Sequence, residues 1–140
     1  MKSKYNKRMG NLMPDDQMTG LILKDLTFQI IAAVYEVHNV LGSGFLENVY
    51  EKALLKELRL RGMTAVPQKE IVVKYKDEEV GSYFADILVN DEVILELKAV
   101  DSLRKIHEAQ LLNYLKATGK RIGLLINFGK QRIEYKRLVL

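Results

Sequence analysis

The sequence predicts an α/β fold in which helices flank a mixed central sheet. Apolar residues recur at helical spacing between residues 23 and 62, and they alternate as in strands between residues 67 and 100. Helical spacing returns at 102–118, and a nearly continuous apolar stretch at 121–129 is typical of a strand in the centre of a sheet. A three-strand meander followed by a crossover helix and another strand forms a mixed sheet that helices cover.

The first two predicted elements are helices. The first covers about residues 23–40, where apolar residues recur near helical spacing: Leu26, Ile30, Ala33, Val34 and Val40. The letters LGSG interrupt this pattern. The second helix follows over residues 45–61 and ends at Gly62, because glycine adopts the left-handed conformation that commonly closes a helix.

Three strands are predicted after Pro67. In the first, Ile71, Val73 and Tyr75 point to one side of the sheet, and the polar letters KDEE form the turn that follows. The second and third strands cover about residues 81–89 and 93–100. Asn90 and Asp91 join them, and both residue types tolerate left-handed turn conformations.

The last predicted elements are a helix and one or two strands. The helix has Ser102 as a possible N-cap and Gly119 as its end. The apolar strand RIGLLINFG follows, and residues 133–140 could add a final strand.

Length and composition fit one compact domain. The chain has 140 residues, of which 48% are hydrophobic, so it can bury a core. The first residues are basic and show no clear period, so we expect a flexible basic arm at 1–22 and a single domain at 23–140. We found no long uncharged apolar stretch and no secretory pattern, so we expect a cytoplasmic protein without a membrane partner.

Composition also excludes several kinds of site. The chain has no cysteine, which excludes disulfides, thiolate nucleophiles and zinc–thiolate sites, and its two histidines argue against an all-protein zinc site. The net charge of +4 comes from four basic residues near the start: Lys2, Lys4, Lys7 and Arg8. The other 18 basic residues balance 18 acidic ones, so affinity of the domain for nucleic acid must come from local clustering of charge.

The stretch FADILVNDEVILELKAV places three charged residues, Asp86, Glu96 and Lys98, in what is otherwise the interior of a sheet. Charges in such places are costly unless they are paired or hold a metal. Alternation puts Glu96 and Lys98 on one face. A two-residue loop would separate Asp86 from Glu96, whereas a three-residue loop at 90–92 sets them opposite each other, and we predict the three-residue loop.

Two opposed carboxylates and a lysine suit one kind of chemistry. Their Cβ atoms would lie about 5 Å apart, and the carboxylates repel each other unless a proton or a cation lies between them. Mg²⁺ takes one or two carboxylates together with water and phosphate oxygens. Lys98 could stabilise charge on a phosphate or help to deprotonate a water. The pattern indicates metal-dependent phosphodiester hydrolysis. The alternative is an ordinary same-face pair of Glu96 and Lys98 on a half-exposed strand.

The order of these motifs resembles the PD-(D/E)XK nuclease superfamily, whose restriction-endonuclease-like core is αβββαβ. The letters GFLENVY at 44–50 spell the G-x-x-E-x-x-Y that names the GxxExxY protein family, a branch of that superfamily. The match continues through YFADILVNDEVILELKAV, HEAQLLNYLKATG and GLLINFG, and covers about residue 26 to the C-terminus. Ala85 stands where the superfamily's name has proline.

The resemblance implies roles for matching residues. Asp86 and Glu96 would bind Mg²⁺ or Mn²⁺, and Lys98 would be the catalytic lysine. Glu47 would be the helix acid that completes or supports the metal site. The implied activity is hydrolysis of DNA. The alternative is a catalytically inactive module of the same fold that binds nucleic acid or protein.

Other residues carry weaker implications. Gln110 and Tyr114 resemble the Gln-x-x-x-Tyr motif that helps to organise the active site of RecB-type exonucleases, although an amphipathic helix often shows such a pair. His38 would be a further metal ligand, as in some RecB-like members. Its favoured alternative is a core histidine with satisfied hydrogen bonds. His107 is expected on a solvated face.

The GxxExxY letters also have a purely structural alternative. Gly44 and Glu47 could form a capping box, with Gly44 as N-cap and Glu47 at the third helical position. For Tyr50 we favour packing over chemistry. The chain has no room for a separate specificity domain, so a homodimer or a partner protein could supply targeting, and a final strand at the sheet edge is one place to pair.

Overall fold

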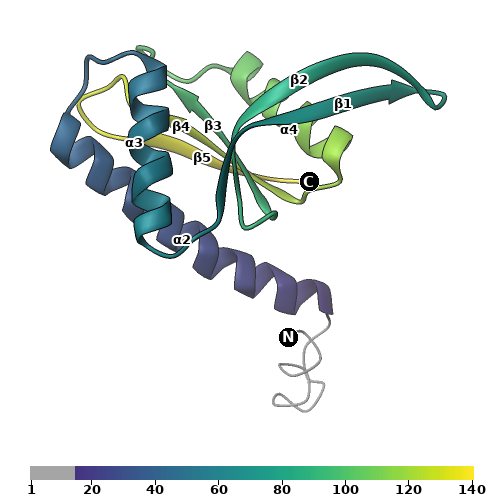
Figure 1. Cartoon of the computed structure of the whole chain (residues 1–140), viewed down its shortest axis with the longest axis horizontal. Coiled ribbons are helices and arrows are strands. Elements are labelled where there is room, and N and C mark those ends of the chain that lie inside the picture. Colours follow the sequence, from purple (N-terminus) through teal and green to yellow (C-terminus); the bar gives the residue numbers. More distant parts are fainter. Residues whose placement is uncertain (1–14) are drawn as a thin grey trace.

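The fold is a five-stranded sheet with helices on both faces. The computed structural model describes the backbone of residues 15–140 and the side chains from residue 23 onward. In chain order the elements are α2 (Asp15–Leu41), α3 (Glu47–Leu60), β1 (Ala65–Tyr75), β2 (Glu78–Val89), β3 (Val93–Lys98), α4 (Lys105–Thr118), β4 (Ile122–Asn127) and β5 (Glu134–Val139) (Figure 1). This order confirms the predicted α/β architecture with its αβββαβ core.

The sheet is mixed, as predicted. Its strands lie in the order β1-β2-β3-β4-β5, so β5 is an edge strand. The pairs β1/β2, β2/β3 and β4/β5 are antiparallel, whereas β3 and β4 are parallel. Parallel neighbours need a crossover connection, and α4 provides it. The crossover brings the C-terminal ends of β3 and β4 to the same edge of the sheet.

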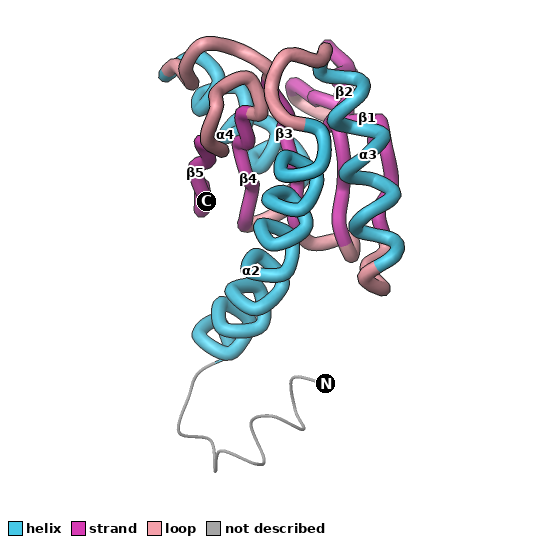
Figure 2. The backbone as a smooth tube through the Cα atoms, turned by 90° about the vertical axis from the view of Figure 1, so that its left-hand side faces the viewer, coloured by secondary structure: helices cyan, strands magenta, loops and turns pink. Residues whose placement is uncertain are grey.

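Two apolar cores lie on opposite faces of the sheet. On one face α2 and α3 pack against inward side chains that include Leu95 and Leu97 of β3. On the other face Ile94 packs with Leu111 and Leu115 of α4. Figure 2 shows α2 and α3 in front of the strands and α4 behind them. Because β3 is covered on both sides, a charged side chain on it is desolvated unless it lies at the strand's end.

The first helix begins earlier than predicted. It starts at Asp15 instead of residue 23, so residues 15–22 of the expected basic arm are helical. Gly20 costs the helix about 1 kcal/mol without ending it. The rest of the expected arm, residues 1–14, lies outside the described residues. Among residues 15–140, no helix combines the length and the apolar character that a membrane span requires.

The third helix begins later than predicted. Its N-cap is Arg104 and not Ser102, because the Nδ1 atom of His107 accepts a hydrogen bond from the Arg104 amide at 3.1 Å. His107 is half-buried and therefore not on a fully solvated face. The predicted end is confirmed, since Gly119 has φ of 74° and its amide donates to the Leu115 carbonyl.

Strands β1 and β2 continue beyond the sheet as a long hairpin. We call residues 72–83 the β1–β2 arm. At its tip Lys76 and Asp77 have φ of 48° and 67°, as in the two-residue turns that match strand twist. The arm curves over α4, and β1 contacts that helix (Figure 1). The β1–β2 arm and α4 form the two walls of a groove.

Candidate active site

The hairpin of β2 and β3 has the predicted three-residue loop. Val89 pairs with Val93, and the register continues to Ile87 opposite Leu95. Asn90 and Asp91 adopt left-handed φ values of 51° and 56°, which these residue types tolerate. One position further along, the register sets Asp86 opposite Glu96.

At Asp86 and Glu96 side chains take over from the backbone ladder. The paired register ends at Ile87 and Leu95. Beyond it, the Leu97 amide donates to Asp86 Oδ2 at 2.7 Å, and the Asp86 amide donates to Glu96 Oε1 at 3.2 Å. The two strands therefore hold the carboxylates in fixed positions. Each carboxylate uses one oxygen in these bonds, so its second oxygen is left for another partner.

The environment of the two acids favours their protonated forms. Burial, followed by the charge of Asp86, raises the pKa of Glu96 from 4.5 to about 8, and this side chain is only 5% exposed. Burial also raises the pKa of Asp86 from 3.8 to about 6, and the charges of Glu51 and Glu47 add to the rise. Near neutral pH the pair retains a proton unless a cation replaces it.

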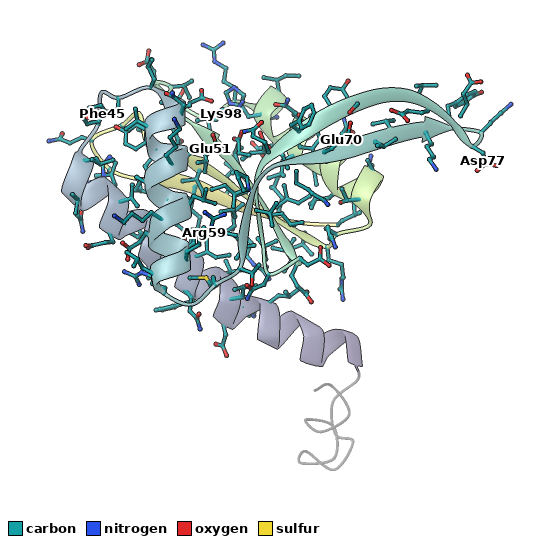
Figure 3. The ribbon with its side chains drawn as sticks, viewed as in Figure 1. Phe45, Glu51, Arg59, Glu70, Asp77 and Lys98 are labelled. Atoms are coloured by element: carbon teal, nitrogen blue, oxygen red, sulfur yellow. The ribbon has the colours of Figure 1, made fainter. Side chains whose placement is uncertain are left out.

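Lys98 lies on the same face of β3, two residues beyond Glu96. Its positive charge lowers the pKa of both acids, although by less than burial raises them. Within residues 23–140 it forms no ion pair shorter than 4.0 Å, so the same-face ion pair considered for it is not formed there. Figure 3 shows Lys98 at the same end of the sheet as Glu51. Its ammonium group is available to a bound anion.

Helix α3 brings two further acids toward the pair. Glu47 is its first residue, and its charge raises the pKa of both Asp86 and Glu96. The structure contradicts the capping-box alternative: the N-cap is Leu46, no side chain caps the helix, and Glu47 stands at the first helical position instead of the third.

Sequence reasoning missed the second acid, Glu51. The charge of Glu51 raises the pKa of Asp86 more than the charge of Glu47 does. The Glu51 Oε1 atom accepts a hydrogen bond from the Gln68 side-chain amide at 2.6 Å. The spacing held a signal, because residues four apart on a helix share a face.

Helix α4 approaches the acids from the other side of the sheet. The Gln110 amide donates to the Tyr114 hydroxyl at 2.8 Å. Burial raises the pKa of the Tyr114 phenol, and the negative charge of Glu96 adds to the rise. The predicted helix pair thus lies beside the acids, and its catalytic role stays a prediction. Since the phenol oxygen accepts from Gln110, the phenol proton is free to be donated.

The model of the PD-(D/E)XK nuclease superfamily matches residues 24–138. The chain belongs to this superfamily. Membership supports a nuclease-like function, implies interaction with nucleic acid, and fits a site that uses a divalent metal, as members generally do. The match does not distinguish among branches of the superfamily.

A solved structure is similar to this one in fold. "Crystal structure of SSO0001" aligns with a TM-score of 0.53 and 19% identity, over 66% of this chain and 48% of that chain. The chain therefore spans about half the length of that protein. At this identity the likeness shows the fold alone. No curated protein matches the chain.

The donor set suits the hard cations that superfamily members use. Within residues 23–140 no group of three or more histidine, aspartate or glutamate side chains is close enough to hold a metal ion. Two carboxylates with free oxygens, those of Asp86 and Glu96, are what Mg²⁺ takes when water and substrate complete its shell. A tetrahedral all-protein zinc site needs more ligands than the pair supplies. The residues therefore fit Mg²⁺ or Mn²⁺, with Glu47 as a nearby acid whose ligand role stays a prediction.

His38 has the structural role favoured for it. Its Nε2 atom lies 3.0 Å from the Lys130 carbonyl, and its ring is buried with its centroid 6.3 Å from that of Phe128. Because this hydrogen bond and this packing engage the side chain elsewhere, the structure does not support His38 as a metal ligand of the acid pair.

Tyr50 also packs, as favoured, and its partner is Phe128. The two rings stack with centroids 4.6 Å apart. The Tyr50 hydroxyl donates to the Gly42 carbonyl at 2.5 Å and accepts from the Phe45 amide at 3.3 Å. Gly44 lies in this loop with φ of 110°, a value that favours glycine. Tyr50, the last residue of the GxxExxY motif, thus fixes the loop that leads to Glu47.

Asn127 is a second residue that sequence reasoning missed. It is fully buried at the end of β4, where its side chain accepts from the amides of Val100 and Gly129 at 3.0 Å each and donates to the Val100 carbonyl at 2.9 Å. A Cβ on Gly129 would lie 2.5 Å from the Val100 backbone, so only glycine permits this approach. The segment that follows Lys98 is thereby fixed. A polar residue at the end of a continuous apolar strand was the available signal.

Proposed function

We propose that this chain is a metal-dependent nuclease that hydrolyses phosphodiester bonds of DNA. The observation that carries the proposal is the pair of opposed carboxylates, Asp86 and Glu96, which backbone amides hold at 2.7 Å and 3.2 Å beside the ammonium group of Lys98. Structure alone does not require two buried like charges at the end of a strand ladder, and their repulsion disfavours them. A bound cation removes that repulsion.

Each residue then has a role that its position supports. Asp86 and Glu96 would hold Mg²⁺, or Mn²⁺. The bound metal would polarise a phosphate oxygen and acidify a water. Lys98 neutralises charge that develops on the phosphate. The Tyr114 phenol, oriented by Gln110 at 2.8 Å, donates its proton toward the pair or the substrate.

We assign the chain to the GxxExxY branch of the superfamily. Gly44, Glu47 and Tyr50 occupy the positions that name the branch. Two contacts support this assignment. The Tyr50 hydroxyl binds the loop before α3, and Glu47, the first residue of α3, raises the pKa of Glu96 by its charge. Glu47 supports the metal site in this assignment.

Cleavage of labelled single- and double-stranded DNA and RNA, with Mg²⁺ or Mn²⁺ and with a chelator, tests the activity. Glu96→Gln removes a metal ligand and Lys98→Ala removes a positive group, and removal of one such electrostatic contact costs about 100-fold or more in rate. Glu36→Gln and Lys56→Ala are matched controls, since both side chains are exposed, on α2 and α3 respectively. Absence of metal-dependent cleavage, or equal cleavage by all five proteins, would overturn the proposal.

The inactive-module alternative also has an observation in its favour. The raised pKa values let Asp86 and Glu96 share one proton, which removes the repulsion between two negative charges. The pair can then accept its hydrogen bonds without any metal. Titration with Mn²⁺ separates the two functions. A metal site gains thermal stability by mass action and loses the gain in Asp86→Asn, whereas a structural pair shows no gain.

A further inference from the structure

A groove lies between the β1–β2 arm and α4. Its volume is about 1040 Å³, slightly above the roughly 300–1,000 Å³ of small-molecule sites. Val72, Val73, Lys74 and Tyr83 form the wall on the arm, and Gln110, Tyr114 and Lys116 are prominent on the helix wall. The groove is therefore large enough for a few nucleotides of an extended strand.

The groove leads to the acid pair. Gln110 and Tyr114 line it. Burial, followed by the charges of Glu96 and Asp86, raises the pKa of the Tyr114 phenol, so both charges reach this side chain. On the opposite wall, Tyr83 precedes Asp86 by three residues on β2, which is on the order of 10 Å along a strand. A chain lying in the groove thus reaches the carboxylates within one or two nucleotides of Tyr83.

The lining suits a polyanion with exposed ring faces. None of the described residues that line the groove is acidic, whereas Lys74 and Lys116 stand exposed on opposite walls without an ion pair within residues 23–140. Tyr83 is 51% exposed and lies against Tyr114 with centroids 5.7 Å apart. Aromatic rings between lysines are what proteins use to bind unpaired bases, because every base has a face that can stack.

We propose that this groove binds a single, unpaired strand of nucleic acid and delivers it to Asp86 and Glu96, so that the preferred substrate is a single strand, a frayed end or a flap. The proposal rests on the proposed nuclease function. A duplex does not satisfy Tyr83, since its base faces are stacked inside the helix and only the backbone and groove edges are exposed. Lys74 and Lys116 hold the phosphates on either side of the stacked base.

Binding measured without divalent metal separates the groove from catalysis. We would follow the fluorescence anisotropy of a labelled single strand and of the same sequence as a duplex, with wild-type protein and variants. Tyr83→Ala should weaken single-strand binding about 10-fold, within the range measured for loss of one base–aromatic stack. Tyr83→Phe keeps the ring and should keep the affinity. The double variant Lys74→Glu, Lys116→Glu should weaken binding further and flatten its salt dependence.

Two controls match these variants. Tyr135→Ala removes an exposed tyrosine on the edge strand β5, and Lys56→Glu reverses a charge on α3; both should bind the single strand like wild type. Equal affinity for duplex and single strand, or an unchanged affinity of Tyr83→Ala, would overturn the groove proposal. If groove variants lose binding while no protein cleaves, the groove stands and the nuclease function fails. If cleavage occurs and the groove variants bind like wild type, the nuclease function stands and the groove proposal fails.

Discussion

Replacing Glu96 by glutamine tests the electrostatics of the acid pair. The glutamine has the same size, and its side-chain oxygen can still accept the hydrogen bond from the Asp86 amide. What the variant loses is a negative charge in a site where only 5% of the side chain is exposed. We expect the metal-free variant to be more stable than the wild type in neutral and alkaline solution.

The size of the effect follows from the pKa of Glu96. In the folded chain this pKa is about 8 instead of 4.5, so the folded state binds a proton that the unfolded state has lost between these two values. Stability of the wild type therefore falls as pH rises through this window. At about 1.4 kcal/mol for each pKa unit, the loss is roughly 3 kcal/mol at pH 7 and roughly 5 kcal/mol above pH 8. The raised pKa of Asp86 acts in the same direction.

Urea denaturation in a chelating buffer at pH 5, 7 and 9 measures this directly. The wild type should lose stability from pH 5 to pH 9, whereas Glu96→Gln should change much less and exceed it at pH 9. Glu92→Gln, at an exposed position in the hairpin loop, is the matched control and should follow the wild type. Wild-type stability that rises with pH across this range, or a variant less stable than wild type at pH 9, would refute the reasoning.

Three further outcomes are expected. Mg²⁺ or Mn²⁺ at about 100 times its Kd should raise the free energy of unfolding by about 2.7 kcal/mol. The gain should need less metal at pH 8 than at pH 6, because protons compete with the metal for the acids. Calorimetry of Asp86→Asn should show no such gain. Asn127→Ala should cost about 2–4 kcal/mol in urea denaturation, since it leaves the half-buried amide and carbonyl of Val100 without partners. A cost below about 0.5 kcal/mol would contradict this role. Gly129→Ala should cost at least about 2 kcal/mol because its Cβ meets the Val100 backbone, whereas Gly81→Ala, with its nearest neighbour at 3.9 Å, is the control and should be much milder.

Local patterns determined most of the fold. The alternating letters of β2 and β3 bury one set of side chains on each face. A slip of one residue would have turned Leu95 and Leu97 away from α2 and α3 and toward α4, and the three-residue loop keeps each set on its own face. Helix starts were less predictable. Helix α2 begins at Asp15, earlier than the apolar pattern predicts, and Arg104 caps α4 because His107 reaches back to it. An apolar pattern alone does not fix the first residue of a helix.

The pairing of the two acids was predictable because both residues share a hairpin. Asp86 and Glu96 are ten residues apart, and one turn geometry decides whether they meet. Glu51 and Asn127 contribute through α3 and β4, and their positions follow from how those elements pack on the sheet. The sequence held a signal for each residue, but neither signal gives the contacts that the residue makes in the fold. His38 shows the converse, since its sequence context allowed a metal ligand and packing against Phe128 assigned it to the core.

The hydrogen bonds of the acid pair decide which substitutions can separate chemistry from folding. Asp86 Oδ2 takes the place of a backbone acceptor for the Leu97 amide, and Glu96 Oε1 does the same for the Asp86 amide. Alanine at either position would leave a half-buried amide without a partner and would loosen the end of the β2/β3 ladder. Loss of cleavage in an alanine variant would therefore be ambiguous. Asp86→Asn and Glu96→Gln keep a hydrogen-bond acceptor at each position. If these folded variants lose cleavage and Glu96→Gln gains stability in alkaline solution, the negative charges serve catalysis and the oxygen atoms serve the structure.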